Sequence, residues 1–96
     1  MHPELGGEET RTSGIIKQVL EEIGVDEIEQ PVGTSVVATI RGGKGPGKCL
    51  ALRADMDALP VQETTGLPYA STVPGVMHAC GHDFHVAMML GNAMIL

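Results

Sequence analysis

Met77-His78-Ala79-Cys80-Gly81-His82-Asp83-Phe84-His85 is the stretch that decides how this chain is interpreted. It holds three of the four histidines and one of the two cysteines. Cys, His and Asp side chains can each offer a lone pair to a divalent metal ion. A structural zinc site draws four protein ligands, usually from two paired motifs, whereas a catalytic site keeps one position open and often takes ligands from distant loops. A single cluster therefore favours part of a catalytic metal site, with polar loop residues as the alternative.

The spacing inside this stretch adds a geometric expectation. His78, Cys80 and His82 alternate, and alternate side chains of an extended backbone point to the same side. Gly81 lets the chain turn tightly between the last two of them. Residues 84–96 then carry apolar side chains at helical spacing, so we expect a helix directly after the cluster.

Two aspartates precede the cluster. Asp55 and Asp57 follow residues 48–54, a run apolar enough for an interior strand, and in extended chain they point the same way. Aspartates at a strand end are often simple turn formers. Beside a metal cluster, we instead expect Asp57 to accept the second ring N–H of a histidine ligand, which fixes its tautomer and orientation. The duty of Asp55 stays open.

The first half of the chain predicts one helix and a hairpin. Residues 8–23 have helical apolar spacing and end before Gly24, a favourable C-terminal cap. After an acidic connector, the β-branched run 33–41 and the glycine-rich turn 42–47 predict a β-hairpin with residues 48–54. Cys49 would then be a small buried hydrophobe.

The remainder of the chain sets broad limits. Residues 61–76 form a long loop, a kind that is often functional. The net charge of −6 argues against nucleic acid and anionic membranes as partners. No apolar run approaches a membrane span, and two cysteines without a disulfide framework suit a reducing compartment, so a cytoplasmic location is expected. A chain of 96 residues has a marginal core.

Two long motifs together resemble one group of metallohydrolases. They are Arg53-Ala54-Asp55-Met56-Asp57-Ala58-Leu59-Pro60 and Gly75-Val76 followed by the stretch quoted first. His2-Pro3-Glu4-Leu5 fits the same group. The chain resembles the amidohydrolase branch of the aminoacylase/carboxypeptidase metallopeptidase superfamily, which contains hippurate hydrolases, N-acyl-amino-acid amidohydrolases and hydrolases of indole-acetyl amino acids. The resemblance covers nearly the whole chain in the right order.

The resemblance implies an α/β fold, the N-terminal portion of a three-layer α/β/α zinc-peptidase-like catalytic domain. That portion would contain two helices, a β-hairpin and a long metal-site loop, within residues 1–96. The smaller domain inserted in the family would lie beyond them. It also implies a centre of two divalent metal ions (Zn, Mn, Co or Ni), with Cys80 and His82 as ligands.

Other residues take their roles from the same resemblance. Asp57 keeps the aspartate position of the sister branches, while Asp55 stands where they have a histidine. His78, Asp83 and His85 become candidates for contacts to the ligands or to substrate. The family's Glu-Glu pair, which supplies a general base and a ligand, and two further histidine ligands come after the equivalent of Leu96.

Three functions stay open from the sequence. The first is hydrolysis of the amide bond of N-acyl amino acids, with these 96 residues inactive alone. The second is a metallo-carboxypeptidase acting on short peptides, and the third is a non-catalytic metal-binding fragment. The partner would be a small-molecule N-acyl amino acid or a short peptide, and a homo-oligomer is compatible with this. Faces meant for the rest of a domain would be exposed, so weak stability or self-association is expected.

Overall fold

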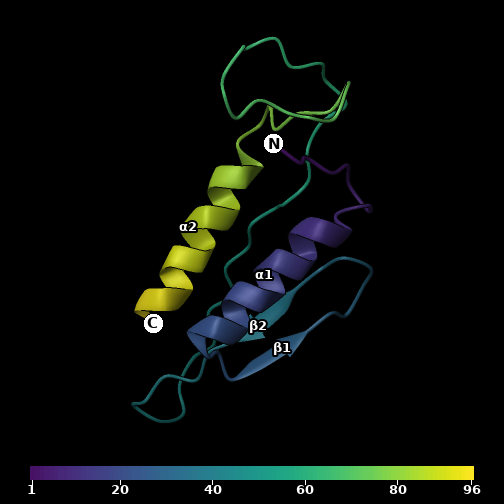
Figure 1. Cartoon of the computed structure of the whole chain (residues 1–96). Coiled ribbons are helices and arrows are strands. Elements are labelled where there is room, and N and C mark those ends of the chain that lie inside the picture. Colours follow the sequence, from purple (N-terminus) through teal and green to yellow (C-terminus); the bar gives the residue numbers. More distant parts are fainter.

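The computed structural model describes all of residues 1–96 and contains two helices and two short strands. In chain order they are α1 (Thr10–Ile23), β1 (Glu27–Glu29), β2 (Val37–Thr39) and α2 (His82–Ile95). The two helices lie side by side, and the strand pair lies next to α1 (Figure 1). The segment between β2 and α2 passes between the helices before it forms a large loop near the N-terminus (Figure 1). The predicted fold class is confirmed.

Helix α1 follows its predicted apolar spacing. Leu20 is buried and Ile16, Val19 and Ile23 are half-buried along one side. Gly24 ends the helix at φ 84° and ψ 41°, where its N–H reaches the carbonyls of Leu20 and Glu21 at 3.1 Å. A left-handed C-terminal residue of this kind is a common helix stop, so the predicted glycine cap is confirmed.

The predicted pairing of the strands is wrong. Strand β2 pairs in antiparallel register with β1, with Ile28 opposite Ala38, and not with residues 48–54. The segment taken for an acidic connector contains β1, in which half-buried Ile28 lies between two exposed glutamates. This polar–apolar alternation suits a strand with one covered side. An ion pair between Arg41 and Glu27 joins the two strands across the ladder.

Residues 48–54 make no strand, and their side chains are largely in solvent. Leu50 is 80% exposed and Leu52 54% exposed. Cys49 is also exposed, so its predicted burial is wrong. The apolar composition of residues 48–54 is typical of a strand covered by neighbouring segments, but no segment of this chain pairs with these residues. Composition reports what a strand could bury and does not supply the partner that would cover it.

The buried core is small. Besides Pro3, only Leu20 and Ala58 are buried apolar residues. Helix α2 begins two residues earlier than predicted and turns the half-buried Val86, Met89 and Leu90 inward, whereas Phe84 is 71% exposed. No helix is both long and apolar enough to cross a membrane. The exposed apolar surface agrees with the expectation that faces of this chain lack cover.

Two isolated bridges bring the distant motifs together. Leu5 pairs with Ala58 in parallel, and Leu59 pairs with Met77 in antiparallel fashion. The backbone bonds are short, with the Ala58 N–H 2.8 Å from the Glu4 carbonyl and the Leu59 N–H 2.9 Å from the Met77 carbonyl. The N-terminal residues, the aspartate pair and the start of the histidine-rich stretch therefore form one layer, and this layer holds the candidate site.

Candidate metal centre

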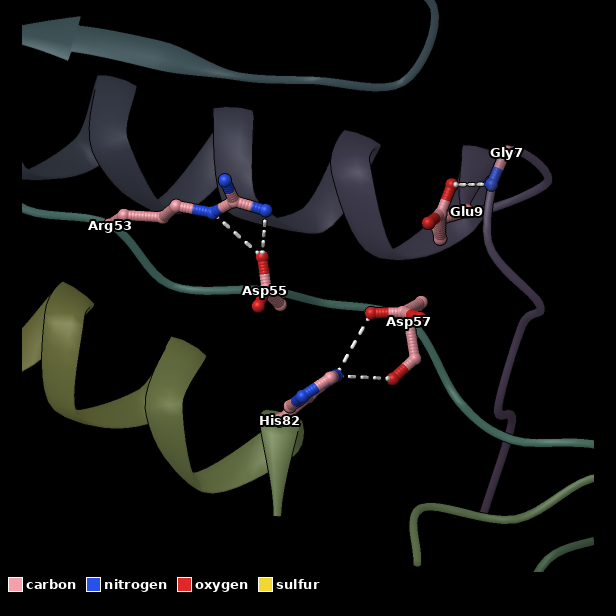
Figure 2. Close-up of polar contacts among 6 residues, drawn as sticks. All are labelled: Gly7, Glu9, Arg53, Asp55, Asp57 and His82. Carbon is pink, nitrogen blue, oxygen red and sulfur yellow. Dashed lines mark hydrogen bonds and ion pairs between the residues drawn. The ribbon is translucent and has the colours of Figure 1, made fainter. Parts of the chain in front are cut away.

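The centre of the candidate site is a contact between Asp57 and His82. The Nδ1 atom of His82 lies 2.9 Å from the Asp57 carboxylate Oδ1 and 3.1 Å from the Asp57 backbone carbonyl oxygen. Figure 2 shows the His82 ring at the start of α2 turned towards both oxygens. The side chains are 17% and 34% exposed for His82 and Asp57, so the pair is only partly open to water. This is the contact expected of a carboxylate that orients a histidine ligand.

This contact also determines the tautomer of the ring. A carbonyl oxygen can only accept a hydrogen bond, so Nδ1 must carry the proton that both Asp57 oxygens share. In the neutral imidazole, the lone pair is then on Nε2. His82 therefore has its free nitrogen available for a metal ion, held in place from the opposite side of the ring.

Asp55 has a different partner. Its Oδ1 accepts hydrogen bonds from Arg53, at 2.9 Å from Nε and 2.7 Å from a terminal nitrogen. In Figure 2 the two side chains lie beside the Asp57–His82 pair, on the segment that passes between the helices. The hydrogen bond from Arg53 lowers the pKa of Asp55, and the nearby His82 and His85 add to the effect. Asp55 thus stays a carboxylate next to the site, with Arg53 occupying one oxygen.

The expected alternation of three side chains on one side is wrong. Gly81 has φ 91° and precedes the first residue of α2, so the backbone is not extended through His82. His78 instead lines a groove of about 270 Å³ between α1 and α2, together with Asp83 and Arg11. Its Nδ1 is buried and has no hydrogen-bond partner. His78 and Asp83 therefore face a different environment from His82.

Cys80 and His85 complete the predicted set. Cys80 is a free, exposed thiol that comes just before the turn at Gly81. His85 is exposed on the first turn of α2, with its ring centroid 5.7 Å from that of His82. No three His, Cys, Asp or Glu side chains gather closely enough in this chain to hold a metal ion by themselves. The assignment of Cys80 and His82 as ligands stays a prediction.

The donor chemistry nevertheless fits a divalent ion. A cysteine sulfur and an oriented imidazole nitrogen are donors that suit Zn²⁺, Co²⁺ or Ni²⁺, whereas Mn²⁺ favours carboxylates. The Asp57 contact leaves the correct histidine nitrogen free. With two donors from this chain, further ligands and water would complete the coordination.

One contributor to this region was missed by the sequence analysis. The carboxylate of Glu4 accepts the backbone N–H groups of Arg11 and Thr12 at 2.9 and 2.7 Å, and the Thr12 hydroxyl at 2.6 Å. Partial burial opposes ionisation of Glu4, but these hydrogen bonds outweigh it and lower its pKa. The helix had been placed from Glu8, whereas α1 starts at Thr10 and Glu4 caps it from upstream. The available signal was the His2–Leu5 motif, which lies just before the helix.

Comparison with known proteins places this site in a family. The model of peptidase family M20/M25/M40 matches residues 51–96, which include both aspartates and the histidine-rich stretch. A crystal structure from Bacillus subtilis, described as a dinuclear metal-binding peptidase of the M20 family, superposes on 98% of the chain. Its TM-score is 0.90 and its sequence identity 50%. Residues 51–96 therefore carry the sequence pattern of peptidase family M20/M25/M40. The two-helix arrangement and the antiparallel strand pair are therefore those of the corresponding part of an M20 structure.

The relatives include both kinds of enzyme that the sequence suggested. An N-acyl-L-amino acid amidohydrolase of Geobacillus stearothermophilus is 50% identical over 98% of this chain and 25% of its own length. Thermostable carboxypeptidase 1 of Saccharolobus solfataricus is 58% identical over 99% of this chain and 24% of its own length. The chain therefore spans about a quarter of the length of these two relatives.

Proposed function

We propose that this chain supplies two ligands, Cys80 and His82, to the binuclear metal centre of a hydrolase that cleaves the amide bond of N-acyl amino acids. The observation that supports the proposal most directly is the hydrogen bonding of His82 Nδ1 to Asp57, which leaves Nε2 free for a metal. Both residues lie in the segment that matches the family. Residues 1–96 would act as the N-terminal part of the catalytic domain.

The residues of this chain would orient and hold rather than transfer a proton. Asp57 fixes the His82 ring, and Arg53 keeps Asp55 charged beside it. Bound divalent ions would lower the pKa of a coordinated water towards about 7 and polarise the scissile carbonyl. His85, which is exposed next to His82, is the nearest candidate for a contact to substrate, with His78 and Asp83 further away in the groove. Zn²⁺, Co²⁺ and Ni²⁺ are the ions to be tried first, because they suit a thiolate and an imidazole, and Mn²⁺ follows because a carboxylate-rich site tolerates it.

A chimera tests this proposal. The segment of the Geobacillus amidohydrolase that matches this chain is replaced by residues 1–96, and N-acyl amino acids, including hippurate, are assayed with added Zn²⁺, Mn²⁺, Co²⁺ or Ni²⁺. Metal-dependent hydrolysis is expected, and Cys80→Ser or His82→Ala should abolish it. Cys49→Ser is the matched control, because Cys49 is also a free, exposed thiol but lies outside the site. A folded chimera with no metal-dependent activity, while the parent relative is active, contradicts the proposal.

A carboxypeptidase acting on short peptides is the second candidate. The observation that favours it is that the relative with 58% identity is named a carboxypeptidase. Assays of the chimera with dipeptides and N-acyl amino acids in parallel separate the two, by the ratio of kcat/KM for each class. If metal binds but neither class is cleaved, the third reading, a non-catalytic metal-binding chain, is supported instead.

The remaining expectations concern the setting of the protein. We propose a cytoplasmic location, supported by two free cysteines and no disulfide. A homo-oligomer is compatible with the exposed apolar residues on 48–54 and α2. Fractionation for the first and sedimentation for the second would test these two points.

A further inference from the structure

We propose that Glu4 is a positioning residue for the metal site, because it ties the start of α1 to the segment that carries Asp57. This inference rests on the proposed function, since it concerns the geometry of a predicted ligand. Glu4 acts twice, through its carboxylate and through its backbone carbonyl. The two contacts go to different parts of the fold.

The carboxylate of Glu4 caps α1. The first turn of a helix has N–H groups without helical acceptors, and Glu4 satisfies two of these, at Arg11 and Thr12. The N-cap residue Glu9 does not take this role, because its carboxylate accepts the Gly7 N–H at 2.8 Å and the Thr34 hydroxyl at 2.6 Å. Figure 2 shows the contact between the Glu9 carboxylate and the Gly7 nitrogen. The position of Glu4 is therefore fixed by a rigid helix.

The backbone of Glu4 holds the aspartate segment. Its carbonyl accepts the N–H of Ala58 at 2.8 Å, and Ala58 is only 3% exposed. Two residues on, Gly6 lies beside Asp57, since a Cβ built on it would be in ordinary contact with the Asp57 carboxylate, 3.6 Å from Oδ2. Asp57 thus lies between the N-terminal segment and His82, with its Oδ1 hydrogen-bonded to His82.

These contacts form a continuous connection from α1 through Glu4 and Ala58 to Asp57 and His82. A shift of the Glu4 segment would move the neighbouring residue of Asp57, and with it both oxygens that hold Nδ1 of His82. A simple helix cap would have no such effect beyond the helix. The two possibilities therefore differ in what happens at His82 when the cap is lost.

Glu4→Gln in the 96-residue chain distinguishes them. The amide replaces one acceptor oxygen with a donor that faces the Thr12 N–H and hydroxyl. Glu8→Gln is the matched control, because Glu8 is exposed and its side chain makes no hydrogen bond. Three quantities are measured for both variants: amide hydrogen exchange at Ala58, the fraction of His82 with the proton on Nδ1 from ¹⁵N shifts, and Co²⁺ affinity. Circular dichroism reports the helix content.

In Glu4→Gln, we expect exchange at Ala58 to rise about fivefold, because the roughly 1 kcal/mol lost at the cap is passed through Glu4 to its backbone bond with Ala58. The Nδ1–H fraction of His82 should fall, and Co²⁺ affinity should drop by up to about tenfold. The proposal is overturned if Glu4→Gln loses helix content while its exchange rate at Ala58 and its His82 tautomer stay the same as in Glu8→Gln. If Glu4→Gln does not fold, Thr12→Val replaces it, because this variant removes only the hydroxyl hydrogen bond to Glu4. Thr12→Val should show smaller changes in the same direction. If its Ala58 exchange and His82 tautomer do not change, the proposal is also overturned.

The readouts separate this inference from the proposed function. The exchange rate and the tautomer need no metal, so they test Glu4 even if the parent chain does not bind Co²⁺. Absence of Co²⁺ binding by the parent would count against Cys80 and His82 as ligands. It would leave the Glu4 result standing.

Discussion

Replacement of Asp57 by Asn should weaken metal binding without unfolding the chain. Asn keeps the shape of the side chain and one acceptor oxygen for His82 Nδ1, and the Asp57 backbone carbonyl at 3.1 Å is unchanged. Only the charge of the acceptor is lost. The Nδ1–H proton should therefore stay in place while the bond that orients the ring becomes weaker.

The size of the effect follows from the bond that changes. A hydrogen bond to a charged acceptor contributes about 1.5–3 kcal/mol and a neutral one about 0.5–1.5 kcal/mol, so the loss is about 1 kcal/mol. Asp57 is 34% exposed, and solvent keeps the difference at the lower end of this range. A loss of about 1 kcal/mol corresponds to about a fivefold weaker Kd. Asp57→Ala, which leaves only the backbone carbonyl, should cost about 10- to 100-fold.

The assay is a Co²⁺ titration of the 96-residue chain, followed by the absorbance of the cysteine–cobalt bond. Asp26→Asn is the matched control, since the Asp26 carboxylate accepts a backbone N–H of Arg41 at the distant strand pair. Its Kd should equal that of the parent. If Asp57→Asn and Asp57→Ala both bind Co²⁺ within twofold of Asp26→Asn, Asp57 does not support the ligand and the reasoning is refuted.

Three further outcomes are expected. Gly24→Ala should lower the Tm by about 4–8 °C, because a Cβ at φ 84° costs about 1 kcal/mol, whereas Gly14→Ala, inside α1 with nothing near its Cβ, should raise it; equal Tm values in thermal melts would contradict this. Glu4 has a lowered pKa when folded, so its stabilisation is present above the unfolded value of 4.5 and lost as the pH falls through the lowered one. The stability gap between the parent and Glu4→Gln, from urea titrations, should therefore close in acid, and a gap constant with pH would disprove the linkage. Leu50→Lys with Leu52→Lys should reduce self-association in sedimentation while helix content is kept, because both side chains are exposed; unchanged association would place the contact elsewhere.

The parts of the fold that could be predicted are those decided by local chemistry. Helix α1, its stop at Gly24 and the inward residues of α2 follow from apolar spacing and a glycine that tolerates positive φ. The contact of Asp57 with a histidine of the cluster could also be anticipated, because a histidine ligand usually donates its second ring N–H to a carboxylate, a carbonyl or water. Each of these expectations depends on residues that adopt few backbone conformations or contact few kinds of partner.

The parts that could not be predicted depend on which segments meet. The residues of 48–54 have the composition of an interior strand, but β2 pairs with β1, and Cys49 stays in solvent. The alternation of His78, Cys80 and His82 was correct as a spacing and wrong as a geometry, because Gly81 turns the chain into α2. Period-2 spacing carries information only where the backbone is extended.

Glu4 illustrates the same limit from the other direction. An acidic residue near a helix start is a familiar signal, and Glu8 and Glu9 are the acids nearest the start of α1 in the sequence. The structure assigns the capping bonds to a more distant carboxylate, while Glu9 turns to Gly7 and Thr34. Which of several glutamates reaches a helix end depends on the path of the chain before it. That path is set here by the bridge between Leu5 and Ala58.

The site is held together by polar contacts rather than by burial. With only Pro3, Leu20 and Ala58 as buried apolar residues, hydrophobic packing cannot fix the His82 ring to within a few tenths of an ångström. Hydrogen bonds are directional and short-ranged. Two Asp57 oxygens can therefore hold the His82 ring, and the Leu5–Ala58 bridge can hold the aspartate segment, even though the core is small. Such contacts are also those that a bound metal would reinforce, since a ligand that binds only the folded chain stabilises it. In this chain, the Asp57–His82 pair is therefore the point at which folding and metal binding are expected to depend on each other.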